Sequence, residues 1–248
     1  MAQRYFLYLA YNGTKYHGWQ VQPNGISIQE ELTKALSTIL RVETPIVGAG
    51  RTDAGVHAKK MIAHFDAEIN CDNNFIKKLN GFLPNDIVIL DIRKTTVNAH
   101  ARFDALQRQY EYHVYTEKNP FLEQFAHRIP SDTNFEKMNF VAKHLFEYTD
   151  FTSFSKLHTD TKTNLCNVTR AEWKYDGEKW IFTIEANRFL RNMVRAIVGT
   201  LLNVGRGTIS EKEFCEIIEK KDRCAASASA PAKGLFLTDV IYPENIFI

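Results

Sequence analysis

Segments with the pattern of β-strands alternate with segments that have the pattern of helices, and this alternation constrains the fold more than any other feature. The clearest strand pair covers residues 168–175 and 180–186, because two β-prone runs flank a turn at Asp176 and Gly177. This spacing predicts an antiparallel hairpin. The second half of the chain therefore contributes strands to a sheet.

The other expected elements follow from capping residues, apolar periodicity and turn formers. The expected helices are residues 27–40, 72–82, 134–145, 188–204 and 210–219, and the expected strands are 4–11, 44–47, 61–65, 87–93, 110–115 and 235–242. Because helices and strands are mixed in both halves, the sequence predicts an α+β fold. Each half has the content of a ferredoxin-like unit, and we expect subdomains of residues 1–105 and 106–248.

The segment from Gly48 to Ala58 has the features of a functional loop between two strands. Its glycines permit positive φ angles and the close approach of a ligand to the backbone. Arg51 lies near enough to keep Asp53 ionised and to grip a phosphate, and a charged carboxylate can serve as nucleophile or base. Spacing alone fits an ordinary turn equally well. The glycine pattern matches neither a dinucleotide fingerprint nor a Walker loop.

The expected helix at 188–204 carries arginines along one side. Arg188, Arg191, Arg195 and Gly199 recur at i, i+3, i+7 and i+11, opposite an apolar stripe. This pattern is typical of a solvated face, and it equally suits the binding of phosphates. The formal net charge is only +2, so a nucleic-acid partner would depend on such local gathering of basic residues.

The composition is that of a globular protein, with 44% hydrophobic and 24% charged residues among 248. No segment approaches the roughly 20 apolar residues of a membrane helix, and no signal sequence is recognised, so we expect a cytoplasmic protein. The cysteines form no C-x-x-C pair, and we expect free, mostly buried thiols without a metal site. They are Cys71, Cys166, Cys215 and Cys224.

Residues 48–58 closely resemble the catalytic signature of the tRNA pseudouridine synthase A family, in which G-R-T-D-A-G-V-H-A carries the aspartate that isomerises uridine. The resemblance continues along the chain, from near residue 5 to near residue 240. Residues 10–22 are similar to Y-D-G-x-x-Y-x-G-W-Q-x-Q, 27–32 to T-V-Q-x-x-L, 98–112 to F-x-A-R-x-x-A-x-x-R-x-Y-x-Y, 189–195 to F-L-x-x-M-V-R, and 230–237 to A-P-x-x-G-L-x-L. In the first of these, Asn12 replaces the usual aspartate.

The resemblance implies a fold, a substrate and an assembly. It implies two ferredoxin-like subdomains that share a mixed, largely antiparallel sheet, with the catalytic cleft between them. The implied activity is conversion of uridine to pseudouridine at positions 38, 39 and 40 of the tRNA anticodon stem-loop. The implied partners are tRNA and a second copy of the chain in a homodimer. The isomerisation requires no metal, redox agent or nucleotide cofactor, and none is expected.

The resemblance also assigns roles to individual residues. Asp53 is expected to act as nucleophile or base, either by attacking the sugar or base covalently or by abstracting a sugar proton to give a glycal. Tyr110 is expected to stack on a flipped uridine, although a tyrosine in a strand is more often core packing. Arg195 is expected to partner Asp53, Arg51 to enter the space left by the flipped base, and Leu235 to line the pocket.

Two other functions compete with this interpretation. The first is a non-catalytic RNA-binding or RNA-chaperone protein, which would have no need of a carboxylate such as Asp53 facing phosphates. The second is a phosphate-ester hydrolase built on Asp53 and His57. It lacks a metal-ligand cluster and a nucleophile with a paired base. His57 is assigned to shaping of the loop.

Overall fold

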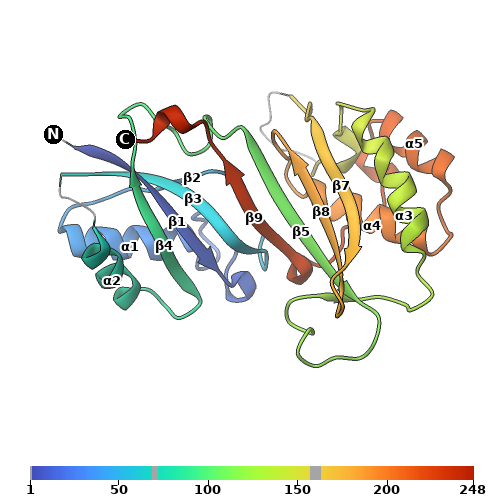
Figure 1. Ribbon diagram of the computed structural model, residues 1–248, viewed down its shortest axis with the longest axis horizontal. Helices are drawn as coiled ribbons and strands as arrows, with labels where there is room; N and C mark the ends of the chain where they lie inside the picture. Colours follow the sequence, from blue (N-terminus) through green and yellow to red (C-terminus); the bar gives the residue numbers. More distant parts are fainter. Residues whose placement is uncertain (1, 69–71, 157–162) are drawn as a thin grey trace. The chain divides into compact units, whose positions relative to one another are not determined.

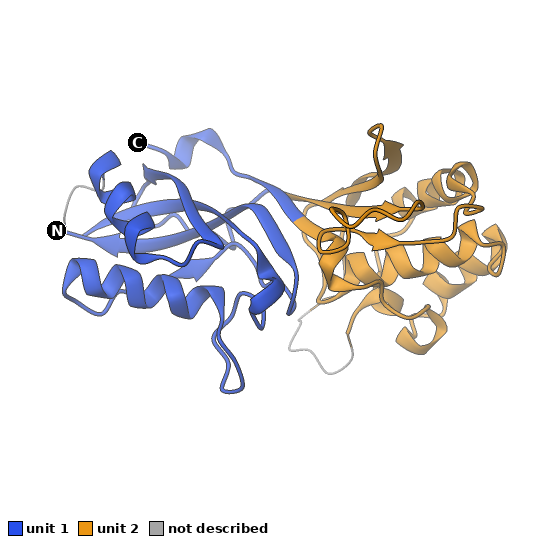
Figure 2. Cartoon of the chain, turned by 90° about the horizontal axis from the view of Figure 1, so that it is seen from below, with its two compact units in different colours: residues 1–107, 237–248 blue, residues 108–236 orange. Residues whose placement is uncertain are grey.

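The computed structural model describes residues 2–68, 72–156 and 163–248. Its helices and its open, mostly antiparallel sheet confirm the predicted α+β class (Figure 1). The chain groups into two compact units. Unit 1 contains residues 1–107 and 237–248, and unit 2 contains residues 108–236 (Figure 2).

Unit 1 is built on four neighbouring strands in the order β4-β1-β3-β9. β1 pairs antiparallel with both β3 and β4, and the short β2 pairs with β3. The helices α1 and α2 contact each other, and α2 contacts β4 (Figure 1). The elements are β1 (Gln3–Tyr11), α1 (Ile28–Leu40), β2 (Val47–Gly48), β3 (His57–Ala67), α2 (Asn73–Phe82), β4 (Ile87–Lys94) and β9 (Leu235–Ile241).

The end of the chain belongs to the core of unit 1 because β1 is apolar on both of its faces. On one face, the ring of Tyr5 stacks on that of Phe65, with 5.7 Å between ring centroids. On the other face, Phe6 meets Tyr242 and Phe247 edge-on at 5.0 and 6.0 Å. The C-terminal segment thus covers a strand face that water would otherwise reach, and Phe6 is fully buried.

Unit 2 combines the antiparallel strands β5-β8-β7 with helices that contact one another in turn. The short β6 runs parallel to β5. Stacked rings of Phe135 and Trp180, 3.9 Å apart, join helix α3 to the sheet. The elements are β5 (Gln107–Tyr115), β6 (His127–Arg128), α3 (Phe135–Ala142), β7 (Val168–Tyr175), β8 (Trp180–Ala186), α4 (Met193–Gly205) and α5 (Glu211–Glu219).

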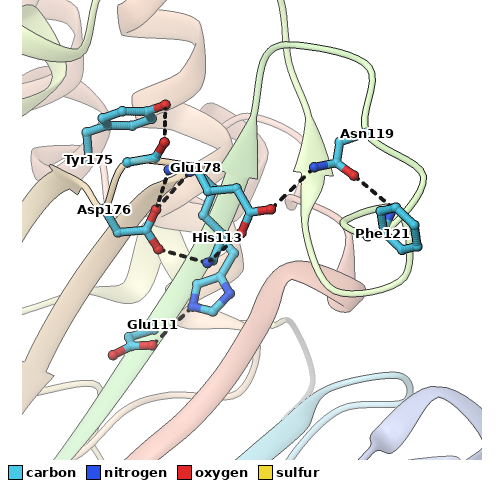
Figure 3. Close-up of polar contacts among 9 residues, drawn as sticks. Glu111, His113, Asn119, Phe121, Tyr175, Asp176 and Glu178 are labelled. Atoms are coloured by element: carbon cyan, nitrogen blue, oxygen red, sulfur yellow. Dashed lines mark hydrogen bonds and ion pairs between the residues drawn. The ribbon is translucent and has the colours of Figure 1, made fainter.

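The predicted hairpin of residues 168–186 is confirmed (Figure 3). The Asp176 carboxylate accepts hydrogen bonds from the backbone N–H groups of Glu178 and Lys179, at 3.0 and 2.9 Å, and from Lys179 Nζ at 2.8 Å. Partial burial raises the pKa of Asp176, but these donors outweigh it and lower the pKa to about 2. Gly177 adopts a φ of +101°, which explains the glycine in this turn.

The prediction of an arginine-bearing helix from residue 188 was wrong. α4 begins at Met193, after Asn192 takes a left-handed φ of 66°, so Arg188 and Arg191 precede the helix. Nearly the whole surface of α4 is buried, and only Arg195, Gly199 and Asn203 are partly exposed. The predicted spacing of three and four residues therefore does not make a continuous basic face, because the chain turns sharply at Asn192 before the helix begins.

Smaller corrections have similar local causes. A strand was expected at residues 44–47, but β2 contains only Val47 and Gly48. Thr44 and Ile46 are buried without belonging to a strand. In α1, Ile39 and Leu40 are only half-buried, whereas the first helical residue, Ile28, is fully buried. The thiols are not mostly buried. Cys166 is buried, Cys215 is intermediate and Cys224 is exposed, and Cys71 lies outside the described residues.

Candidate active site

The loop that carries Asp53 connects β2 to β3 in unit 1. Before the loop, Ala49 N donates a backbone hydrogen bond of 2.7 Å to Ile62 O of β3. Within the loop, Val56 N donates to Asp53 O at 3.2 Å. The second bond closes a turn with Gly55 at a φ of +76°. Asp53 is half-buried, and Arg51 two residues earlier is exposed. One turn thus holds the carboxylate and the guanidinium of the sequence prediction.

A second segment, residues 11–19, supports the loop from outside the β2–β3 connection. Thr52 makes two bonds to it, accepting from Trp19 N at 3.2 Å through its carbonyl and pairing with Tyr11 Oη at 2.9 Å through its hydroxyl. Gly13 N donates to His57 Nδ1 at 3.0 Å, which leaves the proton of a neutral imidazole on Nε2. The assignment of His57 to loop shaping agrees with this bond.

Close backbone contact explains two glycines of the supporting segment. A Cβ on Gly13 would lie 1.9 Å from the carbonyl oxygen of Val56, and a Cβ on Gly18 would lie 2.2 Å from that of Thr52. Gly48 instead packs against the Trp19 ring, with 2.5 Å from its hypothetical Cβ to the nearest ring atom. The loop glycines were expected to admit a ligand. For Gly48 the contact is with a buried tryptophan of the same unit.

Tyr110 lies in β5 of unit 2, opposite Ile184 of β8, and its side chain is half-buried. Its ring meets Phe189 edge-on, with 5.1 Å between centroids and 89° between planes. Tyr112, two residues further on, is fully buried and donates its hydroxyl to Pro231 O at 2.8 Å. Burial raises the pKa of Tyr112, so it stays protonated as this bond requires.

Arg195 is oriented by an extended segment that precedes β9. Its Nε donates to Ala230 O at 2.7 Å, and Ala230 N returns a bond of 2.9 Å to the Arg195 carbonyl. Gly199, one turn later, lets this segment approach, because a Cβ there would lie 2.0 Å from Ala228 O. The guanidinium of Arg195 therefore has a defined direction although it is partly exposed.

Leu235 is the first residue of β9 and is buried, with 6% of its surface exposed. The preceding Gly234 sits so close to Tyr112 that a Cβ would lie 2.9 Å from its ring. The structure thus brings Arg51 and Asp53 together in unit 1, and it places Tyr110, Arg195 and Leu235 in unit 2.

Comparison with known proteins identifies the family. A sequence model described as tRNA pseudouridine synthase matches residues 141–243. A tRNA pseudouridine synthase A of Bacteroides thetaiotaomicron is 58% identical over 99% of this chain and 93% of its own length. The relatives of the same name from Parabacteroides distasonis and Exiguobacterium sibiricum are 55% and 37% identical, over 99% and 98% of this chain and 98% of their own lengths.

The chain belongs to the tRNA pseudouridine synthase A family. The Asp53 loop and the supporting segment 11–19 are thus parts of a tRNA pseudouridine synthase A scaffold. Among the described residues, no group of three or more His, Cys, Asp or Glu side chains could hold a metal ion. The same residues contain no helix that is both long and apolar enough to cross a membrane.

Sequence reasoning missed the residues that hold this synthase loop in place. Tyr11 hydrogen-bonds to Thr52, Gly13 hydrogen-bonds to His57, and Gly18 acts through its lack of a side chain. Their only signal was that they lie within the motif at residues 10–22, and none of the three was assigned a role in holding the loop. Two other aspartates of unit 1 have structural partners. Asp66 binds Arg4 through two bonds of 2.8 Å, and Asp104 accepts from His100 N at 2.7 Å.

A hollow of about 490 Å³ lies elsewhere in unit 1 and contains none of the predicted site residues. Its lining includes Tyr8, Lys60, Arg93 and Asp239. The charges there pair with one another, since Lys60 Nζ lies 2.8 Å from Asp239 and Arg93 Nε lies 2.8 Å from Asp91. Such internal pairing gives the hollow no strong preference for an anion or a cation.

Proposed function

We propose that this chain converts uridine to pseudouridine in the tRNA anticodon stem-loop, at positions 38, 39 and 40, with Asp53 as nucleophile or base. Membership of the tRNA pseudouridine synthase A family supports the reaction and the substrate. The observation that supports the role of Asp53 is its loop, because a partly exposed carboxylate is held there by bonds on both sides of it.

The chemistry needs a group that starts cleavage of the N-glycosidic bond. The bond from N1 of uracil to C1′ of ribose breaks, the detached uracil rotates, and C5 then bonds to C1′ and loses its proton. Asp53 begins this sequence by covalent attack on the sugar or base, or by taking a sugar proton to give a glycal. Because the product is an isomer of the substrate, the electrons balance without any oxidant or reductant.

The remaining predicted residues belong to the same proposal. Tyr110 stacks on the flipped uridine, Arg195 pairs with Asp53, Arg51 fills the space that the base leaves, and Leu235 lines the pocket. The edge-on packing of Tyr110 against Phe189 and the bond from Arg195 to Ala230 support these assignments, because each fixes the direction of its side chain. The proposal includes two subdomains that divide near residue 105, and residues 237–248 group with the first of them rather than with the second.

The decisive experiment measures tritium release from C5-labelled uridine in unmodified tRNA. Asp53→Asn is expected to abolish release while tRNA binding is retained. The matched control is Asp72→Asn, because Asp72 caps α2 by accepting from Asn74 N and Phe75 N, and asparagine caps a helix equally well. This control is expected to release tritium at the wild-type rate.

Other outcomes favour the competing functions. Binding of tRNA without release by the wild type would indicate an RNA-binding protein, and release of phosphate from nucleotides would indicate a hydrolase. Replacing uridine by cytidine at positions 38, 39 and 40, one position at a time, tests the proposed sites.

The proposed homodimer would pool basic surface from two subunits in the cytoplasm, and a monomeric mass at working concentration would contradict it.

A further inference from the structure

The support of the Asp53 loop continues one step further, to a tyrosine of the supporting segment. The backbone carbonyl of Tyr16 accepts a hydrogen bond from Gly55 N at 3.2 Å. Gly55 is the left-handed residue of the turn that Val56 N closes on Asp53 O, so the position of this carbonyl bears directly on the shape of the turn. Tyr16 is 6% exposed and therefore has little freedom of its own.

The side chain of the same tyrosine is anchored to Asp86, in the turn before β4. Tyr16 Oη donates to Asp86 Oδ1 at 2.5 Å, and the backbone carbonyl of Asp86 accepts from Asn12 N at 2.9 Å. Burial, followed by the bond to Asp86, raises the pKa of the Tyr16 phenol, so the hydroxyl remains a donor at neutral pH. Lys15 adds only a distant contact, 3.6 Å from the carboxylate, with 82% of its side chain exposed.

Tyr16 thus links Asp86 to the Asp53 turn, through its hydroxyl on one side and its backbone carbonyl on the other. Its hydroxyl is fixed by a carboxylate from the β4 side of unit 1, and its carbonyl fixes the turn that holds the proposed catalytic carboxylate. Hydrogen bonds to a charged acceptor are short and are stronger than neutral ones. Asp86 is 16% exposed at its side chain, so loss of the hydroxyl would leave a poorly solvated carboxylate without its nearest donor.

We propose that Tyr16 and Asp86 form a positioning pair that sets the geometry of the Asp53 turn. The proposal rests on the proposed function of Asp53, since it assigns the pair a role in the rate of that reaction. The pair touches no reacting atom. It acts by limiting the directions that Asp53 can take, and a misplacement of about 1 Å at a reacting group costs roughly 100-fold in rate.

The test compares Tyr16→Phe, Asp86→Ala and the double variant in single-turnover assays of pseudouridine formation. Each single variant is expected to lower the rate about 10- to 100-fold with unchanged tRNA affinity. Because both substitutions remove the same bond, the losses are expected not to multiply in the double variant. Asp86→Asn keeps an acceptor oxygen, and it is expected to recover most of the rate.

The control is Tyr148→Phe. Tyr148 also donates to a carboxylate, that of Glu219 at 2.9 Å, but it lies in unit 2 and has no bond to the loop. This variant is expected to keep the wild-type rate. Wild-type rates for Tyr16→Phe and Asp86→Ala would overturn the proposal. Losses that multiply, or losses that follow weaker tRNA binding, would overturn it as well.

Amide hydrogen exchange provides a readout that does not depend on activity. In folded Tyr16→Phe, exchange in the peptide containing residues 49–56 is expected to be about tenfold faster than in the wild type, because the acceptor of Gly55 N is less well held. Unchanged exchange would overturn the pairing even if the rate fell. If Asp53→Asn keeps the wild-type rate, the proposed function fails instead, and the exchange result still reports on the pair.

Discussion

Substitution of Gly18 by alanine should damage the Asp53 loop by two physical effects that can be measured separately. Gly18 has a φ of +89°, and a Cβ there would lie 2.2 Å from Thr52 O and 3.0 Å from the carbonyl carbon of Asp53. The first effect is backbone strain, since a left-handed conformation costs an alanine about 1–2 kcal/mol. The second effect is the steric overlap with the loop itself.

The overlap adds more than the strain. Ordinary contact begins at 3.4 Å, so the two segments would have to separate by about 1 Å. That separation breaks the bond of 3.2 Å from Trp19 N to Thr52 O, and a buried donor without a partner costs about 1–3 kcal/mol. We therefore expect Gly18→Ala to lower the free energy of unfolding by about 2–5 kcal/mol. We also expect a loss of roughly 100-fold in single-turnover rate for the molecules that stay folded.

Two matched glycines isolate the effects in urea unfolding and single-turnover assays. Gly207 has a φ of +77° and no atom within 4 Å of a hypothetical Cβ, so Gly207→Ala should show the strain alone, about 1–2 kcal/mol. Gly50, in the Asp53 loop itself, also has nothing within 4 Å, and no positive φ is found there. Gly50→Ala should change stability by less than about 1 kcal/mol. If Gly18→Ala loses no more stability than Gly207→Ala, or keeps the wild-type rate, the close approach of the two segments is wrong.

Two further predictions concern His64 and Gly199. Burial, with smaller effects from the charges of Arg4 and His100, lowers the pKa of His64 to about 4. The unfolded state, with a pKa near 6.5, binds a proton first, so stability should fall by about 3 kcal/mol between pH 6.5 and 4. His64→Gln should flatten this part of the curve of unfolding free energy against pH, and an unchanged slope would contradict the shift. Gly199→Ala should displace the segment that orients Arg195 and lower the single-turnover rate about tenfold. The control is Gly81→Ala, which lies in open space on α2 and should keep the wild-type rate. Equal rates for the two variants would refute the role of that segment.

Local signals predicted most secondary structure because their causes are local. Asp72 and Ser210 cap the helices that were expected from them, and the hairpin around Gly177 has the predicted strand limits. The secondary-structure and burial predictions failed where contacts between residues far apart in the sequence determine the structure. Residues 188–192 have a helical pattern, but Asn192 takes a left-handed φ and α4 starts only at Met193. The burial of Ile28 and the packing of Phe6 under the C-terminal segment likewise depend on partners far along the chain.

In the candidate site, the residues of the motif could be predicted from the sequence, but the residues that hold the motif in place could not. Asp53 and Arg51 could be named from the sequence because both lie in the segment that resembles the family signature, whereas the spacing alone fits an ordinary turn equally well. Tyr16 and Asp86 could not, because one residue follows a common glycine turn and the other ends an ordinary Pro-Asn-Asp sequence, 70 positions apart. Only the fold of β1 and β4 shows that their side chains meet. A substitution at Asp86 would thus look harmless from sequence position alone, yet it acts on the turn of Asp53 through two hydrogen bonds in series.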